Sequence, residues 1–298
     1  MNRIILSAPA KINLFLDVTG KLQNGYHTLD MVMQTISLED EILLEKTTVG
    51  IEISSGNPEV PSGRENICHK AAGAFFEGTA RTGGIKITIK KRIPVAAGLG
   101  GGSSDAAAVL KGMNILYDTG LTPKELCGIG LQCGADVPYF LTGGTCRARG
   151  IGEVLTKLPS FAGVYAVLVM PDFSVSTAWV YQNYRTDDPV RHPDTQTLIS
   201  AIRARDIHKV ARNMKNVLES VTAVKYPEIE GIKRDLKRYG ALGSLMSGSG
   251  PSVFGLFESG EKAAKAFSEL QKTYKQIYLV STTDGGEEYG EADKNKNR

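Results

Sequence analysis

The stretch PVAAGLGGGSSDAAAVL, residues 94–110, places four glycines and two serines directly before an alanine-rich run. Apolar residues recur at helical spacing from Ala106 to Leu116, so a helix is predicted to follow the glycines. The first N–H groups of a helix lack partners within it and lie at the positive end of its dipole. Glycines allow the chain to bend so that these groups converge on an anion. The stretch is therefore either a phosphate-binding loop or a flexible loop capped by Ser104 and Asp105.

Two common nucleotide-binding motifs do not fit this loop. It lacks the GK[ST] ending of a P-loop, which argues against an ordinary P-loop NTPase. No acidic residue is suitably placed after a following strand, which argues against a dinucleotide-binding fold. Glycine content alone leaves the phosphate loop and the capped loop open.

Composition limits the classes of protein and partner. The 298 residues are 42% hydrophobic and 22% charged, which indicates a globular chain of about two domains. A net charge of +3 is too small to predict a nucleic-acid or membrane partner, and we expect neither. The four cysteines lack metal-ligand spacing, and no signal peptide or membrane span is recognised, so we expect a cytoplasmic protein with reduced thiols.

The first half of the chain is predicted to mix strands and helices. Residues 11–18 and 31–38 have strand patterns on either side of an Asn24-Gly25 turn. A helix is expected to begin at Thr122, with Glu125 as its capping partner, and to end at Gly134. The other elements expected in this half are a helix within 65–81, a strand within 84–94 and a hairpin within 143–158.

The second half restarts the pattern near Val164. Strands are expected within 165–170, 243–257 and 276–281, with several helices after the first strand and one within 261–274. This order predicts an α+β sandwich of the split β-α-β kind. The polar tail from about Thr282 is expected to lack structure.

Residues 94–104, of the form PxxxGLGGGSS, resemble the phosphate-binding motif of the GHMP kinases. Residues 7–18, SAPAKINLFLDV, and 245–257, LMSGSGPSVFGLF, resemble the family's first and third motifs. Three motifs in the right order cover almost the whole chain. Residues 9–38 and 134–144 resemble in particular the members whose alcohol substrate carries a cytidine diphosphate group.

The resemblance implies a two-domain α+β fold and an ATP-dependent kinase of a small alcohol. Residues 1–160 would form a domain like ribosomal protein S5 domain 2, residues 161–283 a ferredoxin-like domain, and 284–298 a disordered tail. The cleft between the domains would hold ATP, Mg²⁺ and the substrate. A monomer and a homodimer both remain open, and so do metal ligands beyond Ser103 or Ser104.

The catalytic pair implied by the resemblance is Lys11 and Asp136. Asp136, in GADVP, matches the family's general base, because a carboxylate can accept the hydroxyl proton as the phosphoryl group arrives. Lys11 matches the lysine of PAKINL, and a cation there would keep Asp136 ionised and hold the acceptor hydroxyl or the γ-phosphate. Taken singly, Asp136 would be interpreted as a helix N-cap and Lys11 as a solvated strand residue.

The resemblance also assigns the nucleotide site. Asn66 and Lys91 match the nucleoside pocket, although the basic run from Lys90 to Arg92 also suits a solvated strand end. The residues expected to surround the phosphates are Pro94, Val95, Ala96, Ala97, Gly98, Leu99, Gly100, Gly101, Gly102, Ser103 and Ser104.

Tyr26 and His27 match the family's cytidine-binding pair, since tyrosine stacks on a pyrimidine and histidine can also hydrogen-bond its edge. Asn13 is expected to reach the polyol, because its carboxamide both donates and accepts. Tyr181 aligns best as the second wall of the base site, and Thr177 is a candidate hydroxyl there. The remaining alternatives for that wall are Trp179 and Tyr184.

Other functions remain as alternatives at this stage. A GHMP kinase for homoserine or mevalonate would have no pyrimidine to stack, so the aromatic pair would be unnecessary. A second alternative is a non-catalytic relative that binds RNA through the basic helix of residues 230–240, although this pattern also suits an amphipathic surface helix. Gly248 and Gly250 in the third motif are expected to permit close approach of the backbone to substrate or to the phosphate loop, or simply to form a turn.

Overall fold

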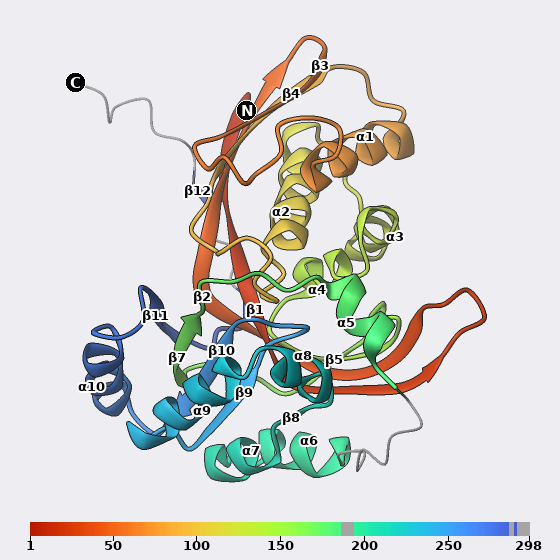
Figure 1. Ribbon diagram of the computed structural model, residues 1–298. Helices are drawn as coiled ribbons and strands as arrows, with labels where there is room; N and C mark the ends of the chain where they lie inside the picture. The colour runs from red at the N-terminus through yellow and green to blue at the C-terminus, as the bar shows by residue number, and fades with distance from the viewer. Residues whose placement is uncertain (186–193, 286–288, 291–298) are drawn as a thin grey trace.

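The chain folds around two β-sheets with helices packed against them (Figure 1). A computed structural model describes residues 1–185, 194–285 and 289–290, and within these ranges one sheet has eight strands and the other four. The larger sheet runs β12-β1-β2-β4-β3, with β5 and β8 also paired to β2 and β1. The smaller sheet runs β11-β7-β10-β9.

The larger sheet is built on a long antiparallel hairpin of β1 (Arg3–Lys21) and β2 (His27–Thr47). At its turn the amide of Tyr26 donates to Asn24 Oδ1, and Gly25 adopts a left-handed φ of 85°, as the Asn-Gly pair predicts. Both strands extend beyond the predicted ranges. Alternation gives way to continuous burial from Ala10 to Val18, because the strand there is covered on both faces. The other strands of this sheet are β3 (Gly50–Ser55), β4 (Gly84–Lys90), β5 (Thr145–Gly150), β6 (Val154–Lys157), β8 (Lys215–Asn216) and β12 (Tyr289–Gly290).

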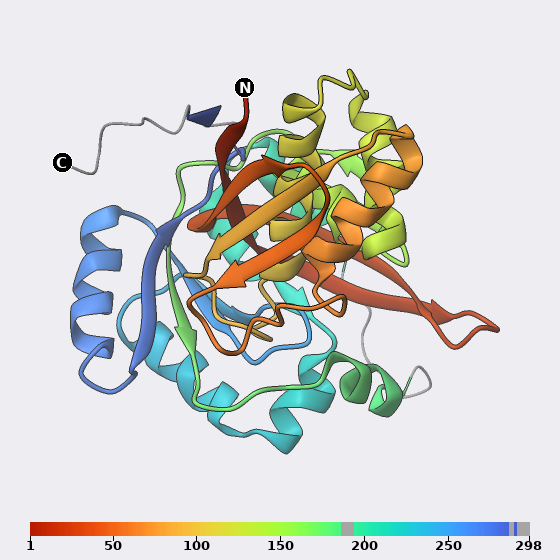
Figure 2. The same cartoon turned by 90° about the horizontal axis from the view of Figure 1, so that it is seen from above.

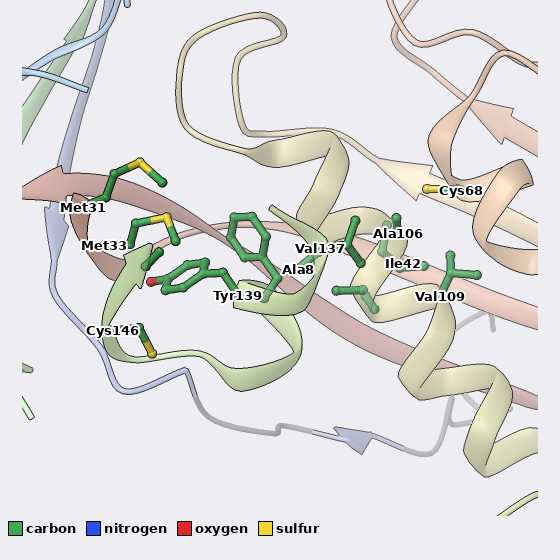
Figure 3. Packing of buried hydrophobic residues seen from close by; sticks show 14 of the residues in the cluster. Ala8, Met31, Met33, Ile42, Cys68, Ala106, Val109, Val137, Tyr139 and Cys146 are labelled. Atoms are coloured by element: carbon green, nitrogen blue, oxygen red, sulfur yellow. The ribbon is translucent and has the colours of Figure 1, made fainter. Parts of the chain in front are cut away.

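Helices α1 (Ile67–Thr79), α2 (Gly101–Leu116), α3 (Pro123–Cys133) and α4 (Val137–Thr142) gather on one side of this sheet, as Figures 1 and 2 show. α2 lies closest, since a Cβ added at Gly112 would come 2.4 Å from Leu44 Cδ1. α3 begins at Thr122 with the predicted capping box to Glu125. Figure 3 shows the buried side of these elements, with Tyr139 beside Met33. The Tyr139 hydroxyl donates to the carbonyl of Gly144, which fixes α4 to the strands.

The smaller sheet is entirely antiparallel and is formed by β7 (Tyr165–Met170), β9 (Gly243–Met246), β10 (Val253–Phe257) and β11 (Gln276–Ser281). Numbered by sequence, its strands lie in the order 4-1-3-2, which is the predicted split β-α-β arrangement. Residues 243–257, predicted as one strand, form two strands around a turn. The helices of this half are α5 (Thr177–Asn183), α6 (Thr195–Arg203), α7 (Ile207–Asn213), α8 (Glu219–Lys225), α9 (Glu228–Arg238) and α10 (Gly260–Leu270).

The two halves are joined through β1. β8 lies far along the chain yet pairs in parallel with Phe15 and Leu16 of β1. The expectation of a tail without structure was wrong for its first residues. The backbone N–H of Thr283 donates to the carbonyl of Thr35, Asp284 accepts a hydrogen bond from the Ser160 hydroxyl, and β12 pairs with β1. Backbone pairing therefore outweighs the polar composition of these residues. The rest of that tail lies outside the described residues, and the domain limits at 160 and 283 stay predictions.

Candidate active site

A cavity of about 1160 Å³ is enclosed by segments from both halves of the chain. Its walls come from β1, the β1–β2 turn, the loop before α1, the glycine loop, the start of α4, and α5. Eighteen of the twenty predicted site residues line it, and only Leu99 and Ser104 lie elsewhere. The lining residues are Lys11, Asn13, Tyr26, His27, Asn66, Lys91, Pro94, Val95, Ala96, Ala97, Gly98, Gly100, Gly101, Gly102, Ser103, Asp136, Thr177 and Tyr181.

The glycine loop turns sharply into α2 and leaves the helix N-terminus open to the cavity. Gly98 and Gly100 adopt left-handed φ values of 75° and 72°. A Cβ at Gly98 would come 2.3 Å from the carbonyl oxygen of Ser247, and one at Gly100 would come 2.6 Å from the Phe140 ring, so neither position has room for a side chain. Gly100 occupies the N-cap position of α2 and supplies no side-chain cap. The N–H groups of the first turn are therefore oriented for an anion rather than capped by the protein.

Two residues predicted to surround the phosphates face away from the cavity. The Ser104 hydroxyl donates to the carbonyl of Pro9 at 2.7 Å, and its side chain is buried. Leu99 is buried in the core, and its carbonyl accepts the backbone N–H of Lys11. Both residues fix the loop against β1, and Ser103 is the serine of the pair that lines the cavity.

Lys11 and Asp136 approach one another from different elements. The Lys11 ammonium donates to Asn13 Oδ1 at 2.6 Å and to the carbonyl of Gly98 at 2.9 Å. Burial lowers the pKa of Lys11, and the negative charge of Asp136 partly restores it. Asp136 stands at the N-cap position of α4, but its side chain accepts no capping hydrogen bond from the helix. The carboxylate is therefore available for another interaction. The pair couples a buried ammonium to a half-buried carboxylate at the cavity wall.

Three aromatic residues also line the cavity, namely Tyr26, His27 and Tyr181. The rings of His27 and Tyr181 stack with centroids 5.4 Å apart, while Tyr26 is 62% exposed. Burial, together with the positive charge of Lys21, lowers the pKa of His27, so its imidazole is neutral at pH 7 and can both donate and accept. Burial raises the pKa of Tyr181, and the charge of Asp136 adds to this effect.

The two alternative aromatic residues are placed differently. Trp179 packs under the Lys225 ammonium, which lies 3.8 Å from its ring centroid. Tyr184 is buried and meets His27 edge-on. Neither lines the cavity, whereas Tyr181 does. The hydroxyl of Thr177, at the start of α5, lies 2.8 Å from that of Ser249 in the third motif.

Asn66 and Lys91 line the cavity but already have partners within the protein. Asn66 caps α1, since its Oδ1 accepts the N–H of Cys68, and its Nδ2 donates to the carbonyl of Pro61. The Lys91 ammonium contacts Asp40 and Asp105, so the expectation of a solvated basic strand end was wrong for this residue. Their roles in nucleotide binding stay predictions.

The third motif packs against the phosphate loop. The Ser247 hydroxyl donates to the carbonyl of Gly98, and the N–H of Ser252 donates to that of Ala97. A Cβ at Gly248 would come 3.1 Å from Gly98 O, so the close approach expected of this motif is to the loop. Sequence reasoning did not assign Ser247, Ser249 or Lys21 to the site, because their positions depend on contacts between distant segments.

The described residues supply no separate metal centre. Among them, no group of three or more His, Cys, Asp or Glu side chains is gathered to hold an ion. Nor is any described helix both long enough and apolar enough to cross a bilayer. The cysteines are free thiols, with Cys68 and Cys146 buried.

Comparison with known proteins identifies the class. Residues 66–144 match the GHMP kinases N terminal domain, and residues 198–276 match the GHMP kinases C terminal family. The fold also matches a homoserine kinase from Cytophaga hutchinsonii with a TM-score of 0.79, at 22% identity over 97% of this chain and 98% of that one. At that identity the likeness shows the fold alone. The chain is thus a GHMP kinase by its fold and by its family matches.

Closer relatives narrow the class. A 4-diphosphocytidyl-2-C-methyl-D-erythritol kinase of Acetivibrio thermocellus is 52% identical over 95% of this chain and all of its own. One of Syntrophomonas wolfei is 47% identical over 94% of this chain and 98% of its own. A crystal structure of 4-(cytidine 5'-diphospho)-2C-methyl-D-erythritol kinase matches with a TM-score of 0.80 at 34% identity, covering 95% of this chain and 100% of that one. The chain belongs to the 4-diphosphocytidyl-2-C-methyl-D-erythritol kinase family of GHMP kinases.

Proposed function

We propose that this protein transfers the γ-phosphoryl group of ATP to the 2-hydroxyl of 4-diphosphocytidyl-2-C-methyl-D-erythritol, a step toward isoprenoid precursors. One observation carries the proposal. A single cavity is lined by an open helix N-terminus, by the Lys11–Asp136 pair, and by Tyr26, His27 and Tyr181. These parts suit a polyphosphate, an acceptor hydroxyl and a pyrimidine respectively.

The glycine loop is the proposed phosphate site. The left-handed glycines open the first turn of α2, where unpaired N–H groups and the helix dipole stabilise negative charge. Mg²⁺ fits this site as a complex with the nucleotide, because it commonly binds through one or two protein oxygens plus substrate phosphates. Ser103 is the hydroxyl available for it, and bound Mg²⁺ would neutralise charge on the phosphates.

Asp136 is the proposed general base. Its carboxylate would accept the proton of the 2-hydroxyl while that oxygen bonds to the γ-phosphorus. The bond from the γ-phosphorus to the bridging oxygen breaks at the same time, and ADP leaves with the electron pair. Lys11 would stabilise the negative charge on the transferred group. Its hydrogen bonds to Asn13 and Gly98 fix the ammonium between the acceptor side and the phosphate loop.

The aromatic residues of the cavity are proposed to select the substrate. Tyr26 and Tyr181 offer ring faces to the cytosine, and the neutral imidazole of His27 can pair with its edge. Asn13 and Thr177 would hold the polyol and the other polar groups of the substrate. Homoserine and mevalonate carry no base that could stack on these rings. A kinase for either substrate would therefore not need the three aromatic side chains.

The remaining expectations about partners also stay proposals. A kinase of a small molecule needs no nucleic-acid surface, and the basic helix expected to offer one is α9, whose Ile229, Ile232 and Leu236 are buried as in an amphipathic surface helix. We propose that the protein acts in the cytoplasm as a monomer or a homodimer.

The test is an ADP-release assay with the cytidyl substrate, homoserine and mevalonate, on the wild type and Asp136→Asn. We expect turnover of the cytidyl substrate alone and a loss of about 10²–10⁴-fold in kcat in the variant. ATP binding, measured by calorimetry, should be unchanged in the variant, which separates loss of the base from loss of the fold. Turnover of another alcohol would refute the assigned substrate, and an active variant would refute the assigned base.

A further inference from the structure

A buried cluster of three charged side chains lies beneath the glycine loop. The Lys91 ammonium contacts Asp40 Oδ2 at 2.6 Å and Asp105 Oδ2 at 2.8 Å. The three side chains are at most 5% exposed. They come from β2, from the residue after β4, and from the first turns of α2, so the cluster joins the elements on both sides of the loop.

The two carboxylates that share this ammonium are not equivalent. Asp40 Oδ1 accepts the backbone N–H groups of Arg92 and Ile93 at 2.5 and 2.8 Å. These amides lie where β4 leads into the glycine loop. Asp105 Oδ1, in contrast, is buried with no hydrogen-bond partner among the described residues. Asp40 therefore holds backbone and ammonium together, whereas Asp105 contacts the ammonium alone.

The charge balance of the cluster supports the same distinction. One ammonium cannot neutralise two buried carboxylates, and burial raises the pKa of Asp105 well above its ordinary value. Asp105 therefore takes up a proton more readily than an exposed aspartate does. The ammonium lies close to the start of α2, because a Cβ added at Gly101 would come 2.9 Å from Lys91 Nζ.

We propose that Asp40 is a positioning residue for nucleotide binding: it holds the beginning of the glycine loop through two amides and the beginning of α2 through Lys91. The N–H groups of the first turn of α2 then keep their orientation toward the phosphates. The Lys91 ammonium contributes by fixing the loop from beneath rather than by contacting the nucleotide. The inference rests on the proposed use of ATP and assigns no step of the reaction to Asp40.

The test compares Asp40→Asn with Asp105→Asn, since the two variants make the same change of carboxyl to amide on the two sides of one ammonium. We expect the Kd for Mg·ATP, measured by calorimetry without the alcohol, to rise at least about tenfold in Asp40→Asn. In Asp105→Asn it should stay within about twofold, because the amide resembles the protonated acid. The KM for the alcohol should stay within about twofold in both variants, a split that a general loss of structure would not produce.

Equal changes in both variants, or unchanged ATP binding in Asp40→Asn, would overturn the proposal. If Asp40→Asn fails to fold, Asp40→Glu replaces it as the test variant. This change keeps the charge but displaces it by one methylene, and we expect the same rise in the Kd for Mg·ATP. Unchanged binding in that variant would equally overturn the proposal. A wild type that binds ATP but does not phosphorylate the cytidyl alcohol would refute the proposed function, and the comparison of Kd values would still test Asp40.

Discussion

At the scale of single residues, the candidate site contains a buried charge, the Lys11 ammonium, that lowers the stability of the fold. Lys11 is 5% exposed, and the free-energy cost of removing its ammonium from water is offset only in part by two acceptors and the nearby Asp136. A residue that is costly to bury but suited to chemistry is typical of a functional site.

Lys11→Met should therefore stabilise the protein while reducing its activity. We expect the free energy of unfolding at pH 7 to rise by about 1–2 kcal/mol, because a buried charge that is only partly compensated is replaced by an apolar chain. Gly98 O keeps the Ser247 hydroxyl as a donor, so only Asn13 Oδ1 loses its partner. Urea unfolding measures this difference, and ADP release should show the accompanying loss of turnover.

The pH dependence of that difference follows from the lowered pKa of Lys11. The folded state disfavours the ammonium, so the penalty is present below the folded-state pKa and disappears as pH rises toward the ordinary value of 10.5. The stability gained in Lys11→Met should accordingly shrink with rising pH. A variant less stable than the wild type at pH 7 would contradict this account.

At the scale of elements, the junction between the glycine loop and α2 depends on two backbone conformations. Gly98 and Gly100 adopt left-handed φ values, while Gly102 lies inside the first turn of the helix. The three glycines thus look alike in the sequence but have different physical requirements. A left-handed position penalises any Cβ, whereas a helical position favours alanine over glycine.

Gly98→Ala should destabilise the protein by about 2–4 kcal/mol, from the left-handed backbone and the contact with Ser247 O that its Cβ would make. Gly102→Ala is the matched control. Its Cβ would meet nothing closer than Ile67 Cγ2 at 3.5 Å, so it should gain about 0.5–1 kcal/mol. Thermal unfolding of both variants tests the pair, and losses of similar size would show that the backbone conformation is not what matters.

At the scale of the whole molecule, the third motif connects the smaller sheet to the phosphate loop. The turn between β9 and β10 carries Ser247, whose hydroxyl donates to Gly98 O and accepts the N–H of Asn13 at 3.4 Å. One buried hydroxyl thus links the smaller sheet, the glycine loop and β1. The cavity depends on this link, because its walls come from both halves of the chain.

Ser247→Ala should lower the free energy of unfolding by about 1–3 kcal/mol and raise the KM for ATP, since buried groups lose their partner. Ser252→Ala is the control from the same turn. Its hydroxyl is equally buried but donates only to Met170 Sδ, so the loss should stay below about 1 kcal/mol. Urea unfolding and ADP-release kinetics measure the two effects. If the control loses as much as Ser247→Ala, the link between the halves is not the cause.

Local features of the fold were predictable from the sequence because they depend on neighbours along the chain. The Thr122–Glu125 capping box, the Asn24-Gly25 turn and the helix after the glycines each follow from a few adjacent residues. The family resemblance extended this to the candidate site, and eighteen of its twenty predicted residues line one cavity. Strand ends were less predictable, since β1 and β2 continue as far as their partners allow.

Only the tertiary structure decided the contacts between segments that are distant in the sequence. Ser104 turned away from the cavity because Pro9 of β1 offers an acceptor, and Lys91 is held because Asp40 lies beside it on the neighbouring strand. The sequence by itself determined which residue types reach the site and the order in which they occur. Their partners, burial and pKa values were decided by the packing of two halves around β1, because these properties depend on which atoms replace water around each group.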